Sequence, residues 1–352
     1  MNLDKFVKRY RIRDAEKFRL ADFVPDDRGG LGLNKESAQA VLAKDIRRLA
    51  DLQERLYAQD RWAVLVILQA MDAAGKDSVI KHVMTGINPQ GCHVFPFKAP
   101  SSEDLDHDFL WRAARALPER GRIGIFNRSY YEDVLVVRVK RGLLQAEKLP
   151  PRLVSNRIWA ERFKDIRAFE RHLARNGTVV LKFFLYVSKD EQRQRFLDRL
   201  EEPAKRWKFR MGDIEDRGLW DRYMTAYEEM IRHTSTEHAP WHVVPADYKW
   251  FTQLVVAATI IGALHRLDLK YPVVKGEALD EMKAVRKALL AEPAPGDGEK
   301  EEEEDEKAPA PPRRAAAKLS GSRARSSPAK AARARRPRAR RRKRRAGRQA
   351  RR

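Results

Sequence analysis

The chain has very little cysteine and no long hydrophobic run. Its 352 residues include one cysteine, Cys92, which excludes an intrachain disulfide framework and a multi-cysteine metal site. We expect Cys92 to be a partly buried small side chain rather than a reactive thiol. No stretch of about 18 apolar residues occurs, and the charged N-terminus "MNLDKFVKRYRIRD" precedes no apolar signal region. These absences predict a cytoplasmic protein that does not span a membrane.

Acidic residues are missing from the end of the chain, so the charge is unevenly divided. Residues 313–352 hold 19 lysines and arginines and no acid, whereas residues 292–312 carry a net charge of −7. Of the total charge of +23, +11 therefore remains in residues 1–291. A body that is basic without its tail indicates a polyanionic partner.

Residues 292–352 are rich in proline, alanine and charge and lack hydrophobic periodicity, which predicts a disordered tail. We expect its basic end to bind nucleic acid or polyphosphate without sequence specificity, by releasing counterions. Such binding would associate the protein with the nucleoid or with polyphosphate granules. A tail that serves only solubility or tethering is the alternative.

Residues 1–291 alternate between apolar runs and helical patterns, which predicts an α/β fold with a mainly parallel sheet. The run "WAVLVILQA" suits a strand buried on both faces of that sheet. Ser101 with Asp104 matches a helix-capping pattern, and Asn176 with Gly177 a helix stop. The expected strands are 62–70, 122–127, 178–188 and 241–246, and the expected helices are 36–59, 101–117, 156–177, 189–202 and 218–234.

The segment "LQAMDAAGKDSVIKHV" (68–83) follows the first of these strands and resembles a phosphate-binding loop with two substitutions. Gly75 and Lys76 keep the essential pair of that motif. A helix that begins near Lys76 points free backbone N–H groups at anionic oxygens, and the lysine adds a positive charge. The strand, turn and helix in this order therefore predict a site for phosphate groups.

The two substitutions change how a metal ion would be held. Ala70 replaces a glycine of the loop, and Asp77 replaces the hydroxyl that ordinarily holds Mg²⁺. Asp72 offers a carboxylate ligand instead, because Mg²⁺ takes one or two carboxylates together with phosphate oxygens. Capping of the following turn is the alternative role for Asp72.

The segment "GIFNRSYYEDV" (124–134) ends the second predicted strand, where phosphoryl-transfer enzymes place a metal-binding acid. Here that position is the neutral Asn127, followed by Arg128, whose rigid fork suits phosphate oxygens. Glu132 and Asp133 lie just beyond. They either serve the site or form a solvated or helix-capping pair.

Residues 201–223 contain a basic segment, residues 205–210, in which four cations lie around two aromatic side chains. A mobile segment of this kind could close over a phosphate site, exclude water and stabilise the transferring group. A solvated basic loop is the alternative. The cations are Lys205, Arg206, Lys208 and Arg210, and the aromatic residues are Trp207 and Phe209.

Together these motifs resemble the polyphosphate kinases of family 2, phosphate-loop enzymes that move phosphate between inorganic polyphosphate and nucleotides. The resemblance extends over about residues 5–272, in the family's order. The matching stretches are "FRLADFVPDDRGGL" (18–31), "LQAMDAAGKDSVIKHVMTGINPQGCHVFPFKAP" (68–100), "FLWRAARALPERGRIGIFNRSYYEDVLVVRV" (109–139), "NRIWAERFKDIRAFERHL" (156–173), "RLEEPAKRWKF" (199–209) and "HAPWHVVPADYKWF" (238–251).

The resemblance implies a three-layer α/β/α sandwich with a helical lid at about residues 200–220. It implies that Asp72 and Lys76 serve the loop, where polyphosphate, nucleotide phosphates and Mg²⁺ converge, and that Arg128 clamps phosphates. Residues 205–208 would belong to the lid. The family also implies a homo-oligomer.

One departure from the family pattern indicates a subgroup. Many members carry a metal-binding aspartate where this chain has Asn127, and "YYED" here replaces "WYNR". Both features resemble the subgroup that accepts nucleoside monophosphates and diphosphates. Asn127 is therefore a doubtful metal ligand, which directs attention to Asp72 and, near the acceptor, to Glu132.

The expected site combines these positions. Its catalytic residues are Asp72, Lys76 and Arg128, and its metal ligand is Asp72. The cofactor is Mg²⁺, with Mn²⁺ as the substitute, and the substrates are inorganic polyphosphate with ADP or AMP, or ATP in reverse. The expected phosphate- and nucleotide-binding residues are Ala73, Ala74, Gly75, Asp77, Ser78, Lys81, Lys98, Asn127, Glu132, Lys205, Arg206 and Lys208.

Two other functions compete with this one. An ATP-dependent nucleotide or small-molecule kinase would have been favoured by a hydroxyl after Lys76, which Asp77 replaces. A nucleic-acid-binding module acting through the basic tail would not need Asp72, Gly75 and Arg128 together. A transfer to ADP needs no strong general base, because the acceptor oxygen is ionised at pH 7.

Overall fold

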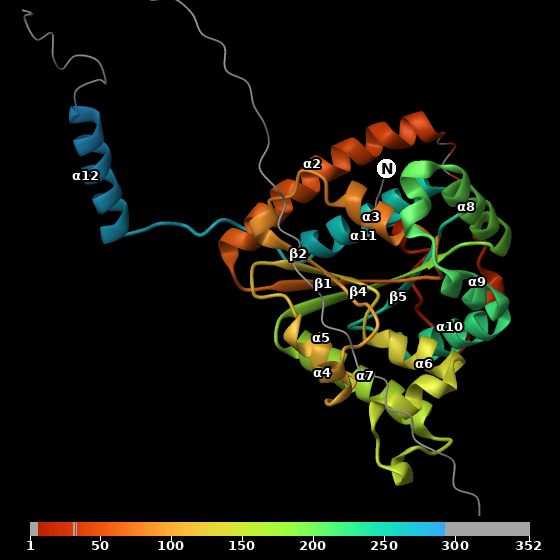
Figure 1. Cartoon of the computed structure of the whole chain (residues 1–352). Coiled ribbons are helices and arrows are strands. Elements are labelled where there is room, and N and C mark those ends of the chain that lie inside the picture. Colours follow the sequence, from red (N-terminus) through yellow and green to blue (C-terminus); the bar gives the residue numbers. More distant parts are fainter. Residues whose placement is uncertain (1–5, 31, 33, 293–352) are drawn as a thin grey trace, which may run out of the picture. The chain divides into compact units, whose positions relative to one another are not determined.

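The computed structural model of the protein describes residues 6–30, 32 and 34–292 (Figure 1). At its centre lies a five-stranded sheet in the order β2-β3-β1-β4-β5, and all neighbouring strands are parallel. This confirms the predicted α/β fold. The strands are β1 (Ala63–Gln69), β2 (Cys92–Pro96), β3 (Ile123–Asn127), β4 (Thr178–Tyr186) and β5 (Trp241–Pro245).

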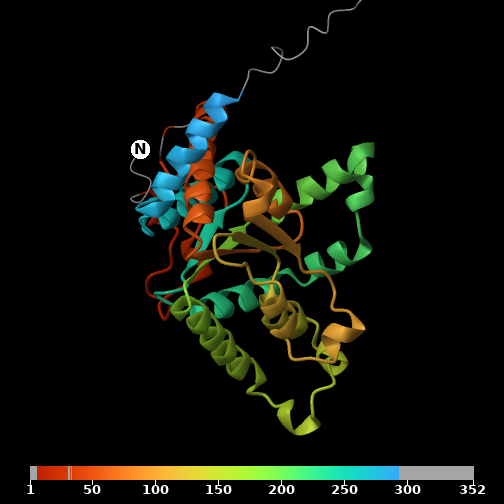
Figure 2. The ribbon, with the colours of Figure 1, turned by 90° about the vertical axis from the view of Figure 1, so that its left-hand side faces the viewer.

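Helices cover both faces of the sheet, so the molecule has the three layers that the family resemblance implied (Figures 1 and 2). On one face α11 packs against α2, α3 and the strands β4 and β5, and on the other α7 packs against β4 and α10. The first layer contains α2 (Lys35–Gln59), α3 (Lys76–Val83) and α11 (Lys249–His265), and the second contains α6 (Val136–Val139), α7 (Ile158–Arg175) and α10 (Trp220–Thr234).

The segment after β4 leaves the sheet and returns to it. It comprises α8 (Lys189–Glu201), the 3₁₀ helix η6 (Pro203–Lys208) and α9 (Met211–Gly218). Figure 2 shows these green helices reaching outwards from one side of the sheet. They occupy the part of the chain in which a lid was expected.

Shorter elements complete the described chain. They are α4 (Ser102–Leu105), α5 (Trp111–Arg115) and the 3₁₀ helices η1 (Leu20–Asp22), η2 (Pro89–Gly91), η3 (Tyr130–Val134), η4 (Arg141–Glu147) and η5 (Pro151–Leu153).

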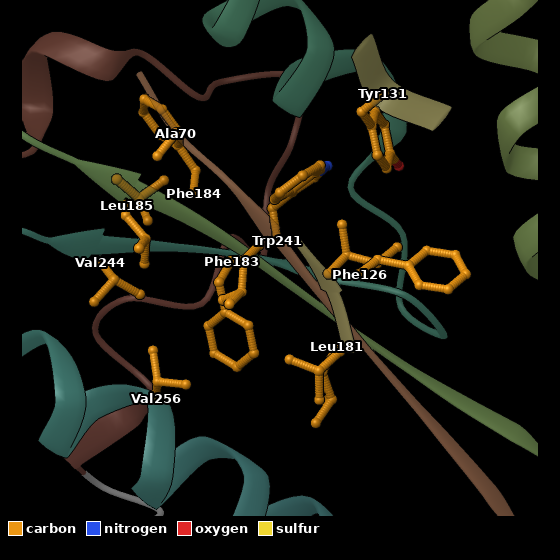
Figure 3. Close-up of a cluster of buried hydrophobic side chains, with 14 of the residues drawn as sticks. Ala70, Phe126, Tyr131, Leu181, Phe183, Phe184, Leu185, Trp241, Val244 and Val256 are labelled. Atoms are coloured by element: carbon orange, nitrogen blue, oxygen red, sulfur yellow. The ribbon is translucent and has the colours of Figure 1, made fainter. Parts of the chain in front are cut away.

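Large apolar side chains from β1, β3, β4 and β5 form the core (Figure 3). Phe126 of β3, Phe183 of β4 and Trp241 of β5 are completely buried, as are Val64 and Ile67 of the central strand β1. Burial of apolar surface contributes about 25 cal/mol per Å². The strands that carry the functional loops are therefore fixed along most of their length.

One ion pair is buried inside this core. Lys182, on β4, donates from Nζ to Glu170 Oε2 of α7 at 2.6 Å. The hydroxyls of Tyr130 and Tyr131 donate to Glu170 Oε1 at 2.8 and 2.7 Å. Burial lowers the pKa of Lys182, against the opposing effect of Glu170. Because the pair is satisfied internally, we assign it to the scaffold.

The four predicted strands are confirmed, but the edge strand β2 was not predicted. It is half exposed, and its sequence "CHVFP" is short and ends in proline, so it lacks the continuous apolar pattern of a buried strand. Cys92 at its start is partly buried, as expected. Burial raises the pKa of its thiol to about 11.

The helix predictions differ from the structure in several places; α12 (Glu277–Ala291), for instance, was not predicted. The helix expected at 101–117 is divided into α4 and α5, because the Asp108 carboxylate accepts from the N–H of Leu110 at 2.9 Å and starts a new turn. The helix α11 was not predicted, because nearly all of its residues after the first turn are buried and no polar face marks a helical period.

The predicted helix ends are confirmed. At α4 the N–H of Asp104 donates to Ser101 Oγ at 3.1 Å, and the N–H of Ser101 donates to Asp104 Oδ2 at 2.8 Å. Asn176 caps the end of α7, and Gly177 follows it with a positive φ of 82°.

The chain divides into two compact units, Met1–Asp280 and Glu281–Arg352. The helix α12 (Glu277–Ala291) spans this division, and its side chains are exposed. The tail that was predicted to be disordered lies, from residue 293 on, outside the described residues. Among the helices that the structure describes, none is long and apolar enough to cross a membrane.

Candidate active site

The loop after β1 has the backbone of a phosphate-binding loop. Ala73 and Gly75 adopt positive φ angles of 64° and 111°, and α3 begins at Lys76 directly after Gly75. Lys76 Nζ donates to the carbonyl oxygens of Ala70 at 2.9 Å and Met71 at 3.3 Å. Burial, aided by Arg128, lowers the pKa of Lys76 to about 8 against the effect of Asp72. The lysine is thus mostly protonated at neutral pH.

The sheet register brings the second motif beside this loop. Leu68 of β1 pairs with Asn127 of β3, so the loops that follow both strands leave the sheet at the same edge. Arg128, with a positive φ of 64°, lies between two carboxylates. Its Nη2 bonds to Asp72 Oδ1, and its Nη1 bonds to Glu132 Oε2 at 3.3 Å. Asp72 and Arg128, distant in sequence, therefore form one charged cluster.

The electrostatics of this cluster favour its charged forms. Burial would raise the pKa of the Asp72 carboxyl, but Arg128 and Lys76 outweigh burial and lower it. Glu132, followed by Asp72, raises the pKa of the Arg128 guanidinium against the effect of burial. Asp72 and Arg128 therefore remain ionised at neutral pH, as the sequence-based hypothesis requires.

A further residue of the cluster was not predicted. Gln69, the last residue of β1, is fully buried, and its Nε2 donates to Glu132 Oε1 at 3.0 Å. Glu132 is thus oriented by Gln69 on one side and Arg128 on the other. A polar residue at the end of the run "WAVLVILQA" was the available signal, because a buried amide needs a partner.

The unusual Asp77 has two partners. Asn127 Nδ2 donates to Asp77 Oδ1 at 2.9 Å, and Lys208 Nζ of η6 lies 3.8 Å from Asp77 Oδ2. The carboxylate that replaces the usual hydroxyl therefore joins the phosphate loop to the neutral position of the second motif and to the basic segment. This contact places Lys208 beside the loop.

Two of the other cations of that segment, Lys205 and Arg206, point elsewhere in this structure. Lys205 pairs with Glu202, and Arg206 donates from Nε to the carbonyl oxygen of Leu200 at 2.8 Å. Among Lys205, Arg206 and Lys208, Lys208 is the cation that lies beside the phosphate loop.

The remaining predicted binding residues lie around the loop. The Ser78 hydroxyl accepts from Gln253 Nε2 at 3.2 Å, and Lys81 is exposed on α3. Lys98 is exposed after β2, and its carbonyl oxygen accepts from Arg112 Nη1 at 2.9 Å. The structure shows these positions without showing a ligand role for any of them.

Two more residues that were not predicted lie on α8. Gln192 and Arg195 are buried and donate to carbonyl oxygens of the phosphate loop. Their signal in the sequence is that two polar residues occupy the inward face of a helix. That placement is informative because polar groups on such a face require partners.

In residues 6–30, 32 and 34–292 no group of three or more histidine, cysteine, aspartate or glutamate residues could hold a metal ion. A Mg²⁺ ion bound together with phosphate groups takes only one or two carboxylates and keeps several water ligands. Asp72 fits such a site, because it is ionised, partly exposed and located in the loop.

Comparison with known proteins agrees with this geometry. The model of the family described as polyphosphate kinase 2 matches residues 32–272. The chain is 49% identical over 285 residues to an "ADP-polyphosphate phosphotransferase" of Rhodopseudomonas palustris, covering 81% of this chain and 98% of that protein. It is 50% identical over 266 residues to an "AMP/ADP-polyphosphate phosphotransferase" of Meiothermus ruber, covering 76% and 96%.

A solved structure shows the same fold. The crystal structure of polyphosphate kinase 2 from Arthrobacter aurescens TC1 superimposes with a TM-score of 0.73 and 38% sequence identity. The match covers 80% of this chain and 96% of that one.

Proposed function

Because the chain belongs to the polyphosphate kinase 2 family, we propose that it transfers the terminal phosphate of inorganic polyphosphate to ADP and AMP, and the phosphate of ATP to polyphosphate in reverse. The observation that carries this proposal is the cluster of Asp72, Lys76 and Arg128 at the phosphate loop. We assign residues 1–291 to the catalytic domain, with a lid at about residues 200–220.

The proposed chemistry needs alignment and charge neutralisation more than a base. Phosphoryl transfer passes through a loose transition state, so the protein must hold donor and acceptor in line and offset their negative charge. Lys76 and Arg128 would contact the oxygens of the transferring group. The backbone N–H groups at the start of α3 would contact neighbouring phosphate oxygens.

Asp72 is the residue that would hold Mg²⁺ in this proposal. Its carboxylate is ionised and lies beside both cations of the site. When bound, the ion would offset phosphate charge and orient the two substrates. Arg128 would then exchange its contact with Asp72 for contacts with phosphate oxygens.

Acceptance of both AMP and ADP is the finer part of the proposal. Asn127 is engaged with Asp77, so it is a less suitable metal ligand than an aspartate would be. Glu132, which is held by Gln69 and Arg128, is the residue of the second motif that we place near the acceptor. The name of the Meiothermus ruber relative includes both nucleotides and supports this reading.

The direct test is nucleotide formation by the purified chain with Mg²⁺, long-chain polyphosphate and either AMP or ADP. We expect Asp72→Asn and Lys76→Ala to lower the rate on the order of 100-fold or more, since each removes a charge that stabilises the transition state. Asp165→Asn and Lys164→Ala, exposed on α7 in the opposite helical layer, are the matched controls and should retain the rate.

Nucleotide formed only with ATP as donor would replace the proposal with an ordinary kinase. Binding of nucleic acid without any phosphate transfer would favour a binding module that acts through the basic tail. Product from ADP but none from AMP would restrict the proposal to diphosphate acceptors.

A further inference from the structure

Three consecutive carbonyl groups of the phosphate loop are bound by one helix. Gln192 Nε2 of α8 donates to the carbonyl oxygen of Asp72 at 2.9 Å. Arg195 Nη1, one turn further along α8, donates to the carbonyl oxygens of Ala73 at 3.0 Å and Ala74 at 2.8 Å. This stretch of loop includes the predicted metal ligand and a residue with positive φ.

The Arg195 guanidinium is fixed on every side. Its Nε donates to Glu191 Oε1 at 2.7 Å, and its Nη2 donates to the carbonyl oxygens of Ala246 at 2.7 Å and Asp247 at 2.9 Å. All of its nitrogen atoms are therefore engaged, and the side chain is only 5% exposed. A buried guanidinium with all its nitrogens bonded has little freedom to move.

This arrangement orients the loop. In a trans peptide unit the C=O and the following N–H point in opposite directions. Since the carbonyl groups of Asp72 and Ala74 point to α8, the N–H groups of Ala73 and Gly75 point away from it. Such N–H groups can bind the oxygens of a phosphate chain.

The same contacts also offset backbone strain. Ala73 is not a glycine, yet it has a φ of 64°. This left-handed conformation is unfavourable for a residue with a Cβ, because the Cβ crowds the backbone. The bond from Arg195 to the Ala73 carbonyl holds the chain in it.

Gln192 is fixed from α9 as well. Its Oε1 accepts from Arg217 Nη1 of α9 at 3.1 Å, and the same Nη1 donates to the carbonyl oxygen of Lys189 at 2.6 Å. The helix α8 thus lies between the loop and the expected lid, with bonds to both.

We propose that Gln192 and Arg195 are positioning residues that hold the phosphate loop in its anion-binding conformation and connect that conformation to the lid. The inference rests on the proposed function, because it names what orients the loop in which polyphosphate is bound. Neither side chain contacts the transferring group.

The test uses Gln192→Met, which keeps the length of the side chain and removes its donor, and Arg195→Lys, which keeps the charge and loses the fork. Two exposed residues of α8 provide matched controls, Gln194→Met and Arg193→Lys. Each full-length variant is checked by its melting temperature. The Kd of tripolyphosphate is then measured by calorimetry, and KM and kcat with long-chain polyphosphate, at a temperature where all variants are folded.

We expect Gln192→Met and Arg195→Lys to raise the Kd of tripolyphosphate and the KM for polyphosphate on the order of 10- to 100-fold, because a misplaced loop loses near-attack geometry. The controls should stay close to the wild type. A merely structural role would lower the melting temperature and leave Kd and KM unchanged in folded protein. That result overturns the inference.

If Arg195→Lys does not fold, Gln192→Met decides the question alone. A wild-type protein that neither binds tripolyphosphate nor forms nucleotide overturns the proposed function and this inference together. Wild-type activity with unchanged variants overturns the inference only.

Discussion

At the scale of the residue, the site consists of charged groups that neutralise one another. Arg128 contacts Asp72 and Glu132, while Asp77 contacts Asn127 and lies near Lys208. Arg128 and Lys208, two of the cations that could bind a phosphate, thus each have a carboxylate nearby. When a substrate binds, its phosphate oxygens must replace the carboxylates as partners of these cations. Until then the carboxylates serve as counterions of the basic site.

A buried acid close to the site predicts a pH-dependent stability. Asp133 is nearly buried and lies among Arg112 of α5, Glu147 of η4, Arg162 of α7 and Glu132. Burial raises the pKa of its carboxyl to about 7, and the arginines oppose this only in part. The folded state therefore favours the protonated carboxyl of Asp133. The stability that this protonation provides is lost as pH rises from about 4 towards 7.

We expect Asp133→Asn to melt at a higher temperature than the wild type at pH 8, with a difference that shrinks as pH falls to 5. The neutral amide replaces the protonated acid without an ionisation penalty. Melting curves by circular dichroism at several pH values measure this. A difference that does not change between pH 5 and 8 would contradict the raised pKa.

At the scale of the element, strands fix positions and helices orient loops. The register of β1 with β3 sets Asp72 beside Arg128, and α8 binds the carbonyl groups of the phosphate loop. The helix α8 is followed directly by η6, which carries most of the basic segment. One helix, α8, therefore connects the phosphate loop with the expected lid. Changes in a strand should therefore affect stability, whereas changes on α8 should affect binding.

The strand β3 offers a test of that distinction. A Cβ added at Gly124 would lie 3.0 Å from three carbon atoms of the Pro118 ring, which is rigid. We expect Gly124→Ala to lower the free energy of unfolding by about 1–3 kcal/mol, as overpacked sites do. Urea unfolding measures the change. Gly142→Ala is the control, because nothing lies within 4 Å of its added Cβ, and equal values for both would contradict the expectation.

At the scale of the whole molecule, the charge is distributed between body and tail. The body holds the proposed site and a net charge of +11, and residues 313–352 hold 19 cations. The family match ends at residue 272, and the described active-site residues all lie within the unit Met1–Asp280. Catalysis should therefore not require the tail.

We expect a chain that ends at residue 292 to keep its kcat with polyphosphate and ADP. Its affinity for duplex DNA should fall, with a shallower dependence on salt, because fewer counterions are released. Fluorescence anisotropy at several salt concentrations measures this, and the full-length chain is the control. Loss of nucleotide formation in the shortened chain would contradict this division of roles, and an unchanged salt dependence would assign polyanion binding to the body.

The sequence by itself determined the strands β1, β3, β4 and β5 and the strand, loop and helix of the proposed phosphate site, and it predicts Asp72, Lys76 and Arg128 as the residues of that site. Local patterns carry this information, because a buried strand is a continuous apolar run and a phosphate loop needs particular residues at fixed spacing. The family resemblance added two expectations, the three layers and the lid. The structure confirms the three layers, and the lid stays a prediction.

Only the tertiary structure decided which side chains meet. Gln69 with Glu132, Lys208 with Asp77, and Gln192 and Arg195 with the loop carbonyls join segments that are distant in sequence. The edge strand β2 and the largely buried, mostly apolar helix α11 were also decided there, because neither carries a periodic pattern of its own. Their form depends on the surfaces that pack against them, and no local sequence pattern contains those surfaces.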